Sequence, residues 1–258
     1  MRILVTNDDG INAPGLKVLA DIAHRLSDDV WIVAPDTNQS GASHSLTLHE
    51  PLRCMEVAEK SFAVRGTPTD CVIMGVRHIL LHSPPDLILS GVNRGSNIAE
   101  DVTYSGTVAG AMEGSLLGIR SLALSQSIDY EAGDIHWDTP LAHGPDIVRR
   151  MLETDWNPSV LMNINFPALA PEEVKGVMVT VQGKRDQSLL HIDERFDNWK
   201  QPYYWFNFER RRSNPLEGTD LWAVYQGLIS VTPLTPNLTH LPATEALSGI
   251  FKSRGSAT

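Results

Sequence analysis

Two adjacent carboxylates, Asp8 and Asp9, follow a short apolar segment at residues 2–6, close to the start of the chain. Side by side, the two negative charges repel each other, and a loop gains little by keeping both unless a positive charge lies between them. Carboxylate oxygens are ligands for hard divalent cations such as Mg²⁺ and Mn²⁺. The competing interpretation is a solvated turn, in which Asn7 and Gly10 accept unusual backbone angles. The motif by itself leaves both interpretations open.

Polar residues also follow two further predicted strands, at segments 36–43 and 90–93. In an open parallel sheet, ligands bind beyond the carboxyl ends of the strands, so we expect these segments to meet residues 7–10 in one crevice. Together they offer oxygen ligands: two carboxylates, a hydroxyl and an amide carbonyl, with room for waters on an octahedral ion. Among the histidines, His44 alone is near these strand ends, which makes zinc a poorer fit.

A fourth polar cluster, residues 104–107, stands directly ahead of a predicted helix at residues 108–119. Hydroxyls and free backbone N–H groups at a helix start can bind an anion. An ordinary helix cap is the alternative, because most Ser and Thr residues at helix starts serve that purpose. Beside a cation site, a phosphate-binding helix start would indicate hydrolysis of a phosphate ester, with the ion polarising the phosphoryl oxygen and supplying hydroxide.

The elements that must position these clusters alternate between strand-like and helix-like segments. Strands are predicted at residues 3–5, 30–34, 61–64, 86–90, 121–125 and 160–164. Helices are predicted at residues 16–26, 68–80, 108–119 and 145–152. The second helix has a clear start, with Thr67 as its cap, Pro68 in its first turn and Asp70 three residues after the cap. The strands are continuous apolar runs that need cover on both faces, so the pattern predicts an α/β fold with a parallel sheet between helices.

From residue 177 onward, strand-like segments dominate. They lie at residues 177–181, 203–208, 221–225 and 228–232. Aromatic side chains are concentrated in residues 196–208, including Trp199, Tyr203, Tyr204, Trp205 and Phe206. We expect this segment to form a hairpin-like arm whose aromatic residues lie in a core or a subunit interface rather than in a ligand site. We expect the small, polar tail from Ser253 to be frayed.

The composition excludes some classes of function. The 258 residues carry a net charge of −10, which disfavours nucleic-acid polymer as a partner because such binding needs a basic surface. The sequence has no apolar run long enough to span a bilayer and no signal segment before the first strand, so we predict a cytoplasmic protein with no membrane partner. Cys54 and Cys71 form no CxxC pair, and we expect both to be buried thiols.

The polar clusters and their surroundings resemble those of the SurE-type survival proteins, a family of metal-dependent nucleotidases. The matching segments are NDDGINAPG (7–15), APDTNQSGAS (34–43), GTPTDCV (66–72), SGVN (90–93) and YSGTVAGAMEG (104–114). Motifs of this length in the same order are highly specific. Beyond residue 130 the resemblance is weaker, although GTD (218–220) and GLISVTPL (227–234) are also similar. One departure is Ala99, where a glycine is common, and we expect it to alter loop flexibility rather than the chemistry.

This resemblance implies a three-layer α/β/α Rossmann-like core with a mostly parallel sheet, and a β-rich C-terminal arm used in oligomerisation. It implies hydrolysis of nucleoside monophosphates to nucleoside and phosphate, and in some members cleavage of short polyphosphate. The partners are then nucleoside monophosphates and further copies of the chain, in a homodimer or homotetramer that exchanges C-terminal segments. We accordingly expect one domain over residues 1–258, with the metal-binding core in 1–130 and the rest of the core, the arm and the tail in 131–258.

The resemblance also implies roles for individual residues. One divalent ion per subunit, Mn²⁺ or Mg²⁺, would be held by Asp8, Asp9, Ser40 and Asn93. The phosphate would lie against Ser105, Gly106 and Thr107. As our own hypothesis, beyond what the resemblance implies, we expect Asn97 to help hold the phosphate or the nucleoside. Asp8 and Asp9 are the catalytic candidates, because either carboxylate could act as a general base through a free oxygen.

Other classes of protein share parts of this pattern. A phosphorelay receiver also has an acidic pair after its first strand, but it needs an Asp and a Lys at strand ends that here carry Asn93 and Gln126. A haloacid-dehalogenase-type phosphatase would use a DxD arrangement, which Asp8 and Asp9 lack. A nucleotide-binding module without catalysis remains an alternative, and phosphate release with and without EDTA separates it from an enzyme.

Overall fold

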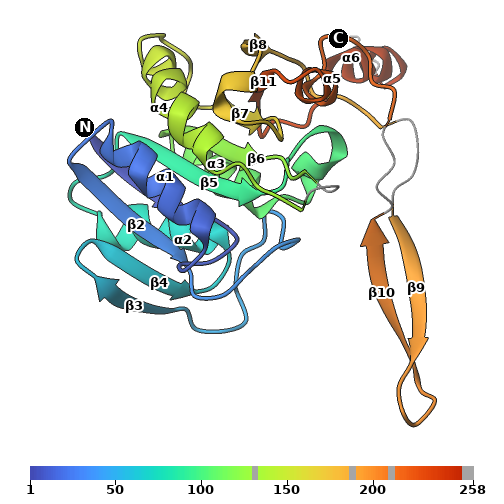
Figure 1. The fold of residues 1–258 in the computed structure, drawn as a ribbon, viewed down its shortest axis with the longest axis horizontal. Coiled ribbons are helices and arrows are strands. Elements are labelled where there is room, and N and C mark those ends of the chain that lie inside the picture. The colour runs from blue at the N-terminus through green and yellow to red at the C-terminus, as the bar shows by residue number, and fades with distance from the viewer. Residues whose placement is uncertain (130–132, 186–189, 209–212, 252–258) are drawn as a thin grey trace, which may run out of the picture.

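The computed structural model, which describes residues 1–129, 133–185, 190–208 and 213–251, is built around a nine-stranded sheet (Figure 1). The strand order is β3-β4-β2-β1-β5-β6-β7-β11-β8. Their bounds are β1 Arg2–Thr6, β2 Asp29–Pro35, β3 Arg53–Ala58, β4 Ser61–Arg65, β5 Leu87–Arg94, β6 Arg120–Gln126, β7 Leu161–Phe166, β8 Val177–Val179 and β11 Ile229–Leu234. The run from β4 to β7 is parallel, whereas β3 and β11 lie antiparallel to their neighbours β4 and β7. The expected mostly parallel sheet is therefore confirmed.

Strand β1 lies at the point where the winding of the sheet reverses. It pairs in parallel with β2 on one side and with β5 on the other. The chain goes first from β1 to β2 and β4, and then crosses back to β5 and continues outward to β6 and β7. Such a reversal opens a crevice beyond the carboxyl ends of the two central strands. The segments that follow β1 and end β5 therefore come to the same place.

Helices cover both faces of the sheet, as Figure 1 shows. Helices α1 (Pro14–His24) and α4 (Asp138–Leu152) pack together over one face. Helices α2 (Pro68–Met74) and α3 (Gly106–Leu116) pack together over the other. The largest core cluster joins Leu19 and Ile22 of α1 to central strand residues such as Val5 and Leu89. These layers confirm the predicted α/β/α architecture.

Helix α2 shows how local sequence places an element. The Thr67 side chain accepts a hydrogen bond from the Asp70 backbone N–H at 3.2 Å, and the Asp70 carboxylate accepts one from the Thr67 N–H at 2.9 Å. This reciprocal cap, followed by Pro68 in the first turn, satisfies backbone donors that a helix start leaves open. The predicted helix over 68–80 is nevertheless divided, because α2 ends at Met74 and a short π-helical turn, Gly75–Ile79, follows it.

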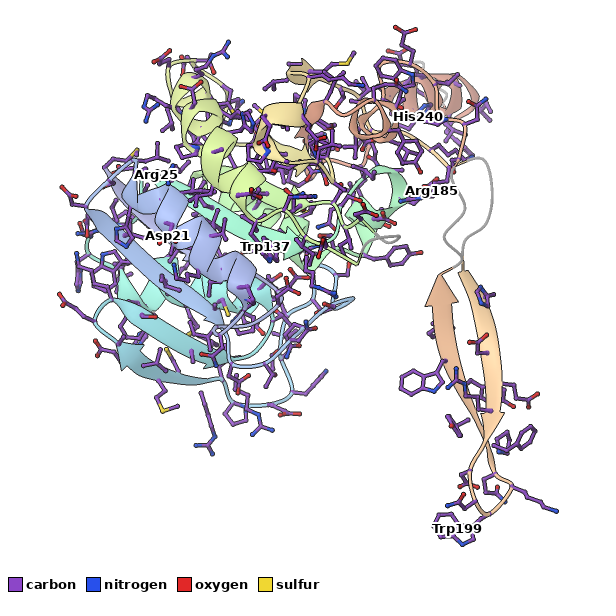
Figure 2. The ribbon with its side chains drawn as sticks, in the orientation of Figure 1. Asp21, Arg25, Trp137, Arg185, Trp199 and His240 are labelled. Carbon is purple, nitrogen blue, oxygen red and sulfur yellow. The ribbon has the colours of Figure 1, made fainter. Side chains whose placement is uncertain are left out.

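The predicted hairpin-like arm is present. Strands β9 (Leu190–Phe196) and β10 (Pro202–Phe208) form a separate antiparallel pair that projects away from the main sheet (Figure 1). Trp199 lies at the tip of this arm (Figure 2) and 80% of it is exposed. A core location for the arm's aromatic residues is therefore wrong for the single chain, and an interface between subunits stays a prediction.

The structure corrects the strand predicted at residues 221–225, which is helix α5 (Asp220–Tyr225). Thr219 caps this helix by accepting a hydrogen bond from the Trp222 N–H at 3.3 Å. A run of five apolar and aromatic residues has no periodicity that separates a strand from a buried helix, so the cap was the deciding signal. The helix predicted at 145–152 begins earlier, at Asp138, and Pro145 lies inside it.

Several elements were not predicted from the sequence, among them strand β9, which precedes the predicted arm segment 196–208, strand β3 and helix α6 (Leu241–Ile250). Strand β3 lies at the edge of the sheet with every residue exposed, and helix α6 is exposed along its whole length. The expectation that Cys54 is buried is wrong for this reason, since Cys54 belongs to β3, whereas Cys71 in α2 is buried. The predicted frayed tail from Ser253 lies outside the described residues.

No helix in the described part of the chain combines the length and the apolar character needed to cross a membrane. The predicted cytoplasmic location and the predicted division at residue 130 stay predictions.

Candidate metal and phosphate site

The turn after β1 is held in shape by the side chain of Asn7. Its amide nitrogen donates to the Gly10 carbonyl at 3.0 Å, and its amide oxygen accepts from the Gly10 N–H at 3.2 Å. Gly10 has a φ of +104°, which favours glycine because other residues carry a Cβ that clashes there. The turn directs the Asp8 carboxylate into the protein, where only 4% of the residue is exposed, and leaves Asp9 partly exposed.

Hydrogen bonds to Asp8 and Asp9 bring together the three predicted strand-end segments. Asn38 donates to Asp9 Oδ1 at 3.3 Å, and the backbone N–H of Arg94 donates to Asp9 Oδ2 at 3.1 Å. The backbone N–H of Gln39 donates to the Asp8 carbonyl at 2.7 Å. The segment after β2 and the end of β5 therefore both contact the acidic pair, as the strand-end argument expected.

The two other predicted metal ligands are held on these same segments. The backbone N–H of exposed Ser40 donates to Asn38 Oδ1 at 2.9 Å, so the Asn38 amide links Asp9 to Ser40. The Asn93 amide nitrogen donates to the Gly95 carbonyl at 2.8 Å. Because the nitrogen is used in this way, Oδ1 is the atom with which Asn93 could bind a cation.

Sequence reasoning missed the role of Asn38. The side chain bridges two of the candidate ligands, and the only signal for it was its place in the 34–43 segment between the second strand and Ser40. It also missed two contacts made at the end of this segment. Ser43 Oγ donates at 2.7 Å to the carbonyl of Thr103, in the turn before α3, and His44 Nε2 lies 2.9 Å from Glu113 Oε2 on α3. These contacts join residues 60 and 69 positions apart, so nothing local to the chain reveals them.

The predicted phosphate cluster forms the start of helix α3. Ser105 is the N-cap, and its hydroxyl accepts a hydrogen bond from the Val108 N–H at 3.0 Å. The first N–H groups of a helix have no partner within it, so those of Gly106 and Thr107 can bind an anion. The Thr107 hydroxyl donates to Asp8 Oδ1, which places the helix start directly beside the acidic pair. Ser105 therefore caps the helix, as the second interpretation expects, and anion binding by the next two residues stays a prediction.

Gly106 allows this close approach. A Cβ at this position would lie 2.7 Å from Asp8 Cβ and 3.1 Å from Asp8 Oδ2. Any other residue would have to displace either the helix start or the turn that carries Asp8. The close packing against Asp8 therefore explains why position 106 is a glycine, although glycine has a low helix propensity.

The electrostatics of Asp8 follow from its burial. Burial raises the pKa of Asp8 from 3.8 to about 6; the Thr107 hydrogen bond opposes this rise, and the charge of Asp9 adds to it. A cation between the two carboxylates would reverse the repulsion and favour the ionised form. Within the described residues, no cluster of three or more His, Cys, Asp or Glu side chains could hold a metal. A cation here would therefore need further oxygen donors, for which Ser40 and Asn93 stay the predicted residues, and such an all-oxygen set fits Mg²⁺ or Mn²⁺.

Asn97 is buried next to the site and is held by three neighbours. Its amide nitrogen donates to Ser125 Oγ at 2.9 Å, and its backbone N–H donates to Asn165 Oδ1 at 2.7 Å. Its carbonyl accepts from the Asn163 side chain at 2.8 Å. One of the two N–H groups on the Asn97 amide is thus used within the protein, and a contact of Asn97 with the phosphate or the nucleoside stays a prediction.

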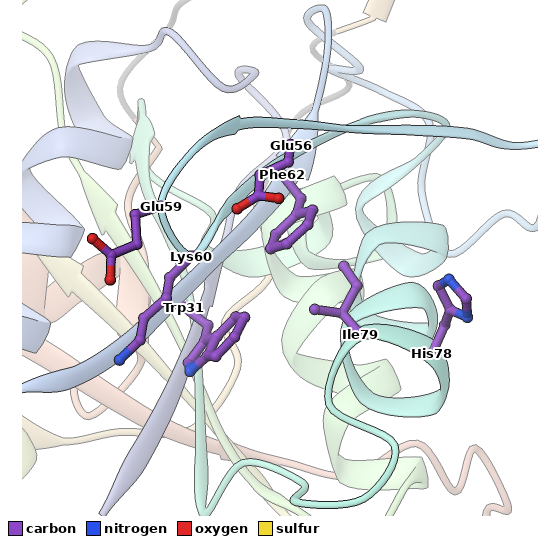
Figure 3. Close-up of a pocket in the computed structure, with 7 residues that line it drawn as sticks. All are labelled: Trp31, Glu56, Glu59, Lys60, Phe62, His78 and Ile79. Carbon is purple, nitrogen blue, oxygen red and sulfur yellow. The ribbon is translucent and has the colours of Figure 1, made fainter.

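A separate cavity of about 610 Å³ lies at the opposite end of β2 and β4 (Figure 3). Its seven described lining residues are Trp31, Glu56, Glu59, Lys60, Phe62, His78 and Ile79. Trp31 stacks on Phe62, and Lys60 is paired with Asp29 at 2.9 Å. With its lysine paired and two carboxylates nearby, this cavity does not suit a phosphate, and it is remote from the carboxyl ends of the strands.

The chain is similar to known proteins over most of its length. A model of the family described as "Survival protein SurE" matches residues 3–189. The chain belongs to the SurE family. A SurE relative from Methylobacterium nodulans, named 5'-nucleotidase SurE, is 58% identical over 254 residues that cover 97% of this chain and 100% of the relative. Another from Rhodopseudomonas palustris, with the same name, is 60% identical over 237 residues, covering 91% of this chain and 93% of the relative.

A solved SurE structure also matches. The crystal structure of the SurE protein from Aquifex aeolicus has a TM-score of 0.84 and 41% sequence identity, and the match covers 97% of this chain and 99% of that one. The resemblance seen in the motifs of the first half therefore extends over almost the whole chain. The weaker similarity beyond residue 130 still corresponds to the same fold.

Proposed function

We propose that this chain hydrolyses nucleoside monophosphates to nucleoside and phosphate, as a metal-dependent 5'-nucleotidase of the SurE family. The observation that carries the proposal is the contact between the buried Asp8 carboxylate and Thr107 in the first turn of α3. A carboxylate pair and an anion-binding helix start occupy the same place, so an anionic substrate needs a cation to join it to the protein. The shared name of the two close relatives supports the reaction.

We propose that one divalent ion per subunit, Mn²⁺ or Mg²⁺, is held by Asp8, Asp9, Ser40 and Asn93 Oδ1. The support is the all-oxygen donor set and the hydrogen bonds through Asn38 and Arg94 that gather it. When bound, such an ion neutralises the two carboxylates and polarises a phosphoryl oxygen.

The residues of the chain then bind and orient the substrate. The N–H groups of Gly106 and Thr107 hold phosphate oxygens, and Ser105 keeps the helix start in place by capping it. Asp8 and Asp9 each have two carboxylate oxygens, so one that is not used as a ligand can orient the attacking water and accept its proton. Asn97 orders the loop through the N–H group that donates to Ser125, and the second N–H group of the same amide can donate to the phosphate or the nucleoside. Positioning and charge neutralisation are the main sources of rate in phosphoryl transfer.

The test is phosphate release from a panel of 5'- and 3'-mononucleotides and short polyphosphates. Each substrate is incubated with Mn²⁺, Mg²⁺ or Co²⁺, and with EDTA. We expect release from mononucleotides that requires a divalent metal. Binding of mononucleotides without any metal-dependent release would favour the alternative, a nucleotide-binding module without catalysis.

Asp8→Asn provides the sharper test of the site. The replacement keeps the shape of the side chain but removes its charge, so we expect metal-dependent phosphate release to fall by at least about a hundredfold while the thermal unfolding of the metal-free protein stays cooperative. Asp21→Asn is the control, because Asp21 lies on the exposed side of α1, where it pairs with Lys17 at 2.8 Å. Normal turnover by the Asp8 variant would remove Asp8 from the mechanism.

We further propose that the protein assembles as a homodimer or homotetramer with exchanged C-terminal segments. The support is the amount of apolar surface that the described C-terminal part exposes, on the arm and on α6. Surfaces of this kind are uncommon on monomers and mark contacts with other proteins.

A further inference from the structure

Residues 95–104, which we call the bridging loop, connect Asn93 at the end of β5 to Ser105 at the start of α3. It therefore joins a proposed metal ligand to the proposed phosphate site. The middle of the loop is a short 3₁₀ turn, Ala99–Thr103. Residues from the second half of the chain hold this turn, although they come 83 to 121 positions later in the sequence.

Asp220, at the start of α5, is fully buried and uses both carboxylate oxygens. Oδ2 accepts a hydrogen bond from the Ala99 N–H at 2.9 Å. Oδ1 accepts from the Gly183 N–H at 2.8 Å and from the Leu221 N–H at 2.7 Å. One carboxylate thus joins the bridging loop to α5 and to the segment that precedes the arm.

Ala99 has a φ of +53°, in the left-handed region that favours glycine. Its backbone is secured on both sides, since its N–H donates to Asp220 and its carbonyl accepts from Gln182 Nε2 at 2.9 Å. These two contacts explain how a non-glycine residue keeps this conformation, which costs free energy when unsupported.

Arg185 makes the ionic contacts to the same turn. Nη2 lies 2.6 Å from Asp101 Oδ2, and Nη1 lies 3.4 Å from Glu100 Oε2. Nη1 also donates to the Ile98 carbonyl at 3.3 Å, and the Arg185 backbone N–H donates to Glu100 Oε1 at 3.1 Å. The Arg185 side chain is only 13% exposed, whereas Glu100 and Asp101 keep 45% and 33% of theirs, so these charged hydrogen bonds are partly shielded from water on the arginine side. Figure 2 shows Arg185 beside the green segment that contains the bridging loop.

The charges in this cluster depend on one another. Burial raises the pKa of Asp101, and the Arg185 charge opposes that rise. Burial likewise raises the pKa of Asp220, which the backbone donors of Ala99, Gly183 and Leu221 oppose. Removing one member would leave a buried charge without its partner, so the cluster acts as a unit.

We propose that Arg185 and Asp220 are positioning residues that hold the bridging loop, so that the first N–H groups of α3 remain next to Asp8. This inference rests on the proposed phosphate site. Among the described contacts, neither side chain touches the Asp8–Thr107 pair. Both instead hold residues 98–101 of the bridging loop, and the position of these residues determines where the loop delivers Ser105 and the start of α3. A loop that is held in place before the substrate arrives binds the phosphate without first having to be ordered.

Arg185→Gln tests the proposal in the full-length protein. The variant keeps a hydrogen-bonding side chain but loses the charge and the fork-shaped donor group. If the loop adopts its substrate-binding conformation for only a fraction of the time, the apparent affinity for substrate falls by that fraction. Bound substrate stabilises the same conformation, so turnover of the bound complex changes little. We therefore expect the KM for a nucleoside monophosphate to rise about fivefold to tenfold, with kcat changed by less than about twofold. Arg185→Lys keeps the charge and should recover part of the loss.

Two further measurements make the result specific. Arg149→Gln is the matched control, because Arg149 forms an exposed pair with Asp146 at 3.3 Å on α4 and should leave KM unchanged. Hydrogen exchange of the metal-free protein should show faster exchange at residues 98–104 in Arg185→Gln than in this control. If Arg185→Gln does not fold, Asp101→Asn removes the negative charge from the same 2.6 Å contact and carries the same expectations.

The outcomes separate the two proposals. Gly106→Ala disturbs the phosphate site directly, so a normal KM in that variant would overturn the phosphate site itself. A raised KM in Gly106→Ala with an unchanged KM in Arg185→Gln would overturn only the positioning role. Additive effects of Arg185→Gln and Asp101→Asn would also contradict it, since residues in one cluster should act non-additively.

Discussion

The Asp8 carboxylate is almost completely buried next to a second acid, an arrangement that is costly in the absence of a cation. With its pKa raised to about 6, ionising Asp8 in the metal-free protein costs roughly 3 kcal/mol more than ionising an exposed aspartate. Asp9 shares its charge with donors from Asn38 and Arg94, whereas Asp8 has the Thr107 hydroxyl. The two neighbouring carboxylates therefore differ in environment, and burial makes the charge state of Asp8 depend on whether a metal is bound.

This difference predicts that metal binding depends on pH. Below about pH 6 a proton competes with the cation for Asp8, so we expect the apparent affinity for Mn²⁺ to fall by up to about tenfold for each pH unit between 6 and 4. Calorimetric titration with Mn²⁺ from pH 5 to 8 measures this directly. An affinity that stays constant from pH 5 to 8 would show that Asp8 does not bind the ion.

The stability of the metal-free protein should change in the opposite direction. A carboxyl group with a raised pKa in the folded state contributes stability that is fully present below its unfolded value of 3.8 and is lost as the pH rises through about 6. Urea unfolding of wild-type protein and Asp8→Asn in EDTA should therefore differ more at pH 7 than at pH 4. This comparison isolates Asp8 from the other carboxylates.

Ser105→Ala is expected to have a smaller effect than Asp8→Asn. The change removes the hydroxyl that caps α3, which costs about 1 kcal/mol of stability. The backbone N–H groups of Gly106 and Thr107 remain, so phosphate release should fall by less than about tenfold. Steady-state kinetics and thermal unfolding check both expectations. A loss as large as that of Asp8→Asn would show that the Ser105 hydroxyl itself contacts the reacting group.

At the scale of elements, the start of α3 is the feature on which the proposed phosphate site depends. The helix begins at Gly106, with Ser105 as cap, and its first turn contacts the residue that follows β1. The polar cluster at residues 104–107 was visible in the sequence, whereas its contact with Asp8 joins positions 99 apart. The start of α3 thus brings the motif at residues 104–107 into contact with the motif at residues 7–10.

Gly106→Ala tests this contact. The added methyl group would lie 2.7 Å from Asp8 Cβ, so we expect a loss of more than about tenfold in kcat/KM and a loss of about 1–3 kcal/mol in stability from overpacking. Gly249→Ala in α6 is the control, because a Cβ there meets no atom within 4 Å. Equal activity of the two variants would contradict the close packing of the helix against Asp8.

Element prediction succeeded where local signals agreed and failed where they did not. The capping box of α2 and the continuous apolar strands were correctly predicted, because both signals lie within a few residues. The segment 221–225 was wrong, since its apolar run suits a strand or a helix and only the Thr219 cap decides. Strand β3 was missed because it is an exposed edge strand with no buried face to produce a pattern.

At the scale of the whole molecule, the C-terminal part presents an apolar surface that the single chain does not cover. Trp199 is 80% exposed and Phe206 is 75% exposed on the arm, and Phe251 after α6 is also exposed. Exposure of this extent is typical of a contact surface rather than of a monomer. It supports the proposed exchange of C-terminal segments between copies.

Replacing both Trp199 and Phe206 with serine tests the assembly. We expect light scattering after gel filtration to show a smaller assembly than the wild type, because aromatic residues supply most of the contact energy in such interfaces. Leu116→Ser is the control, since Leu116 on α3 is 57% exposed and lies outside the arm. An unchanged molar mass in the double variant would show that these two residues do not support an interface.

The sequence alone was sufficient for the α/β class, the mostly parallel sheet, the arm and the family, because apolar runs, caps and long motifs are local in the chain. It also supplied the types of the candidate ligands, since carboxylates and amides imply oxygen coordination wherever they lie. The tertiary structure decided which residues meet: the reversal of the sheet at β1 brings Asp8 to Thr107, and the second half of the chain brings Asp220 and Arg185 to the bridging loop. These contacts join residues far apart in the sequence, and only packing of the sheet and its helices determines such distances.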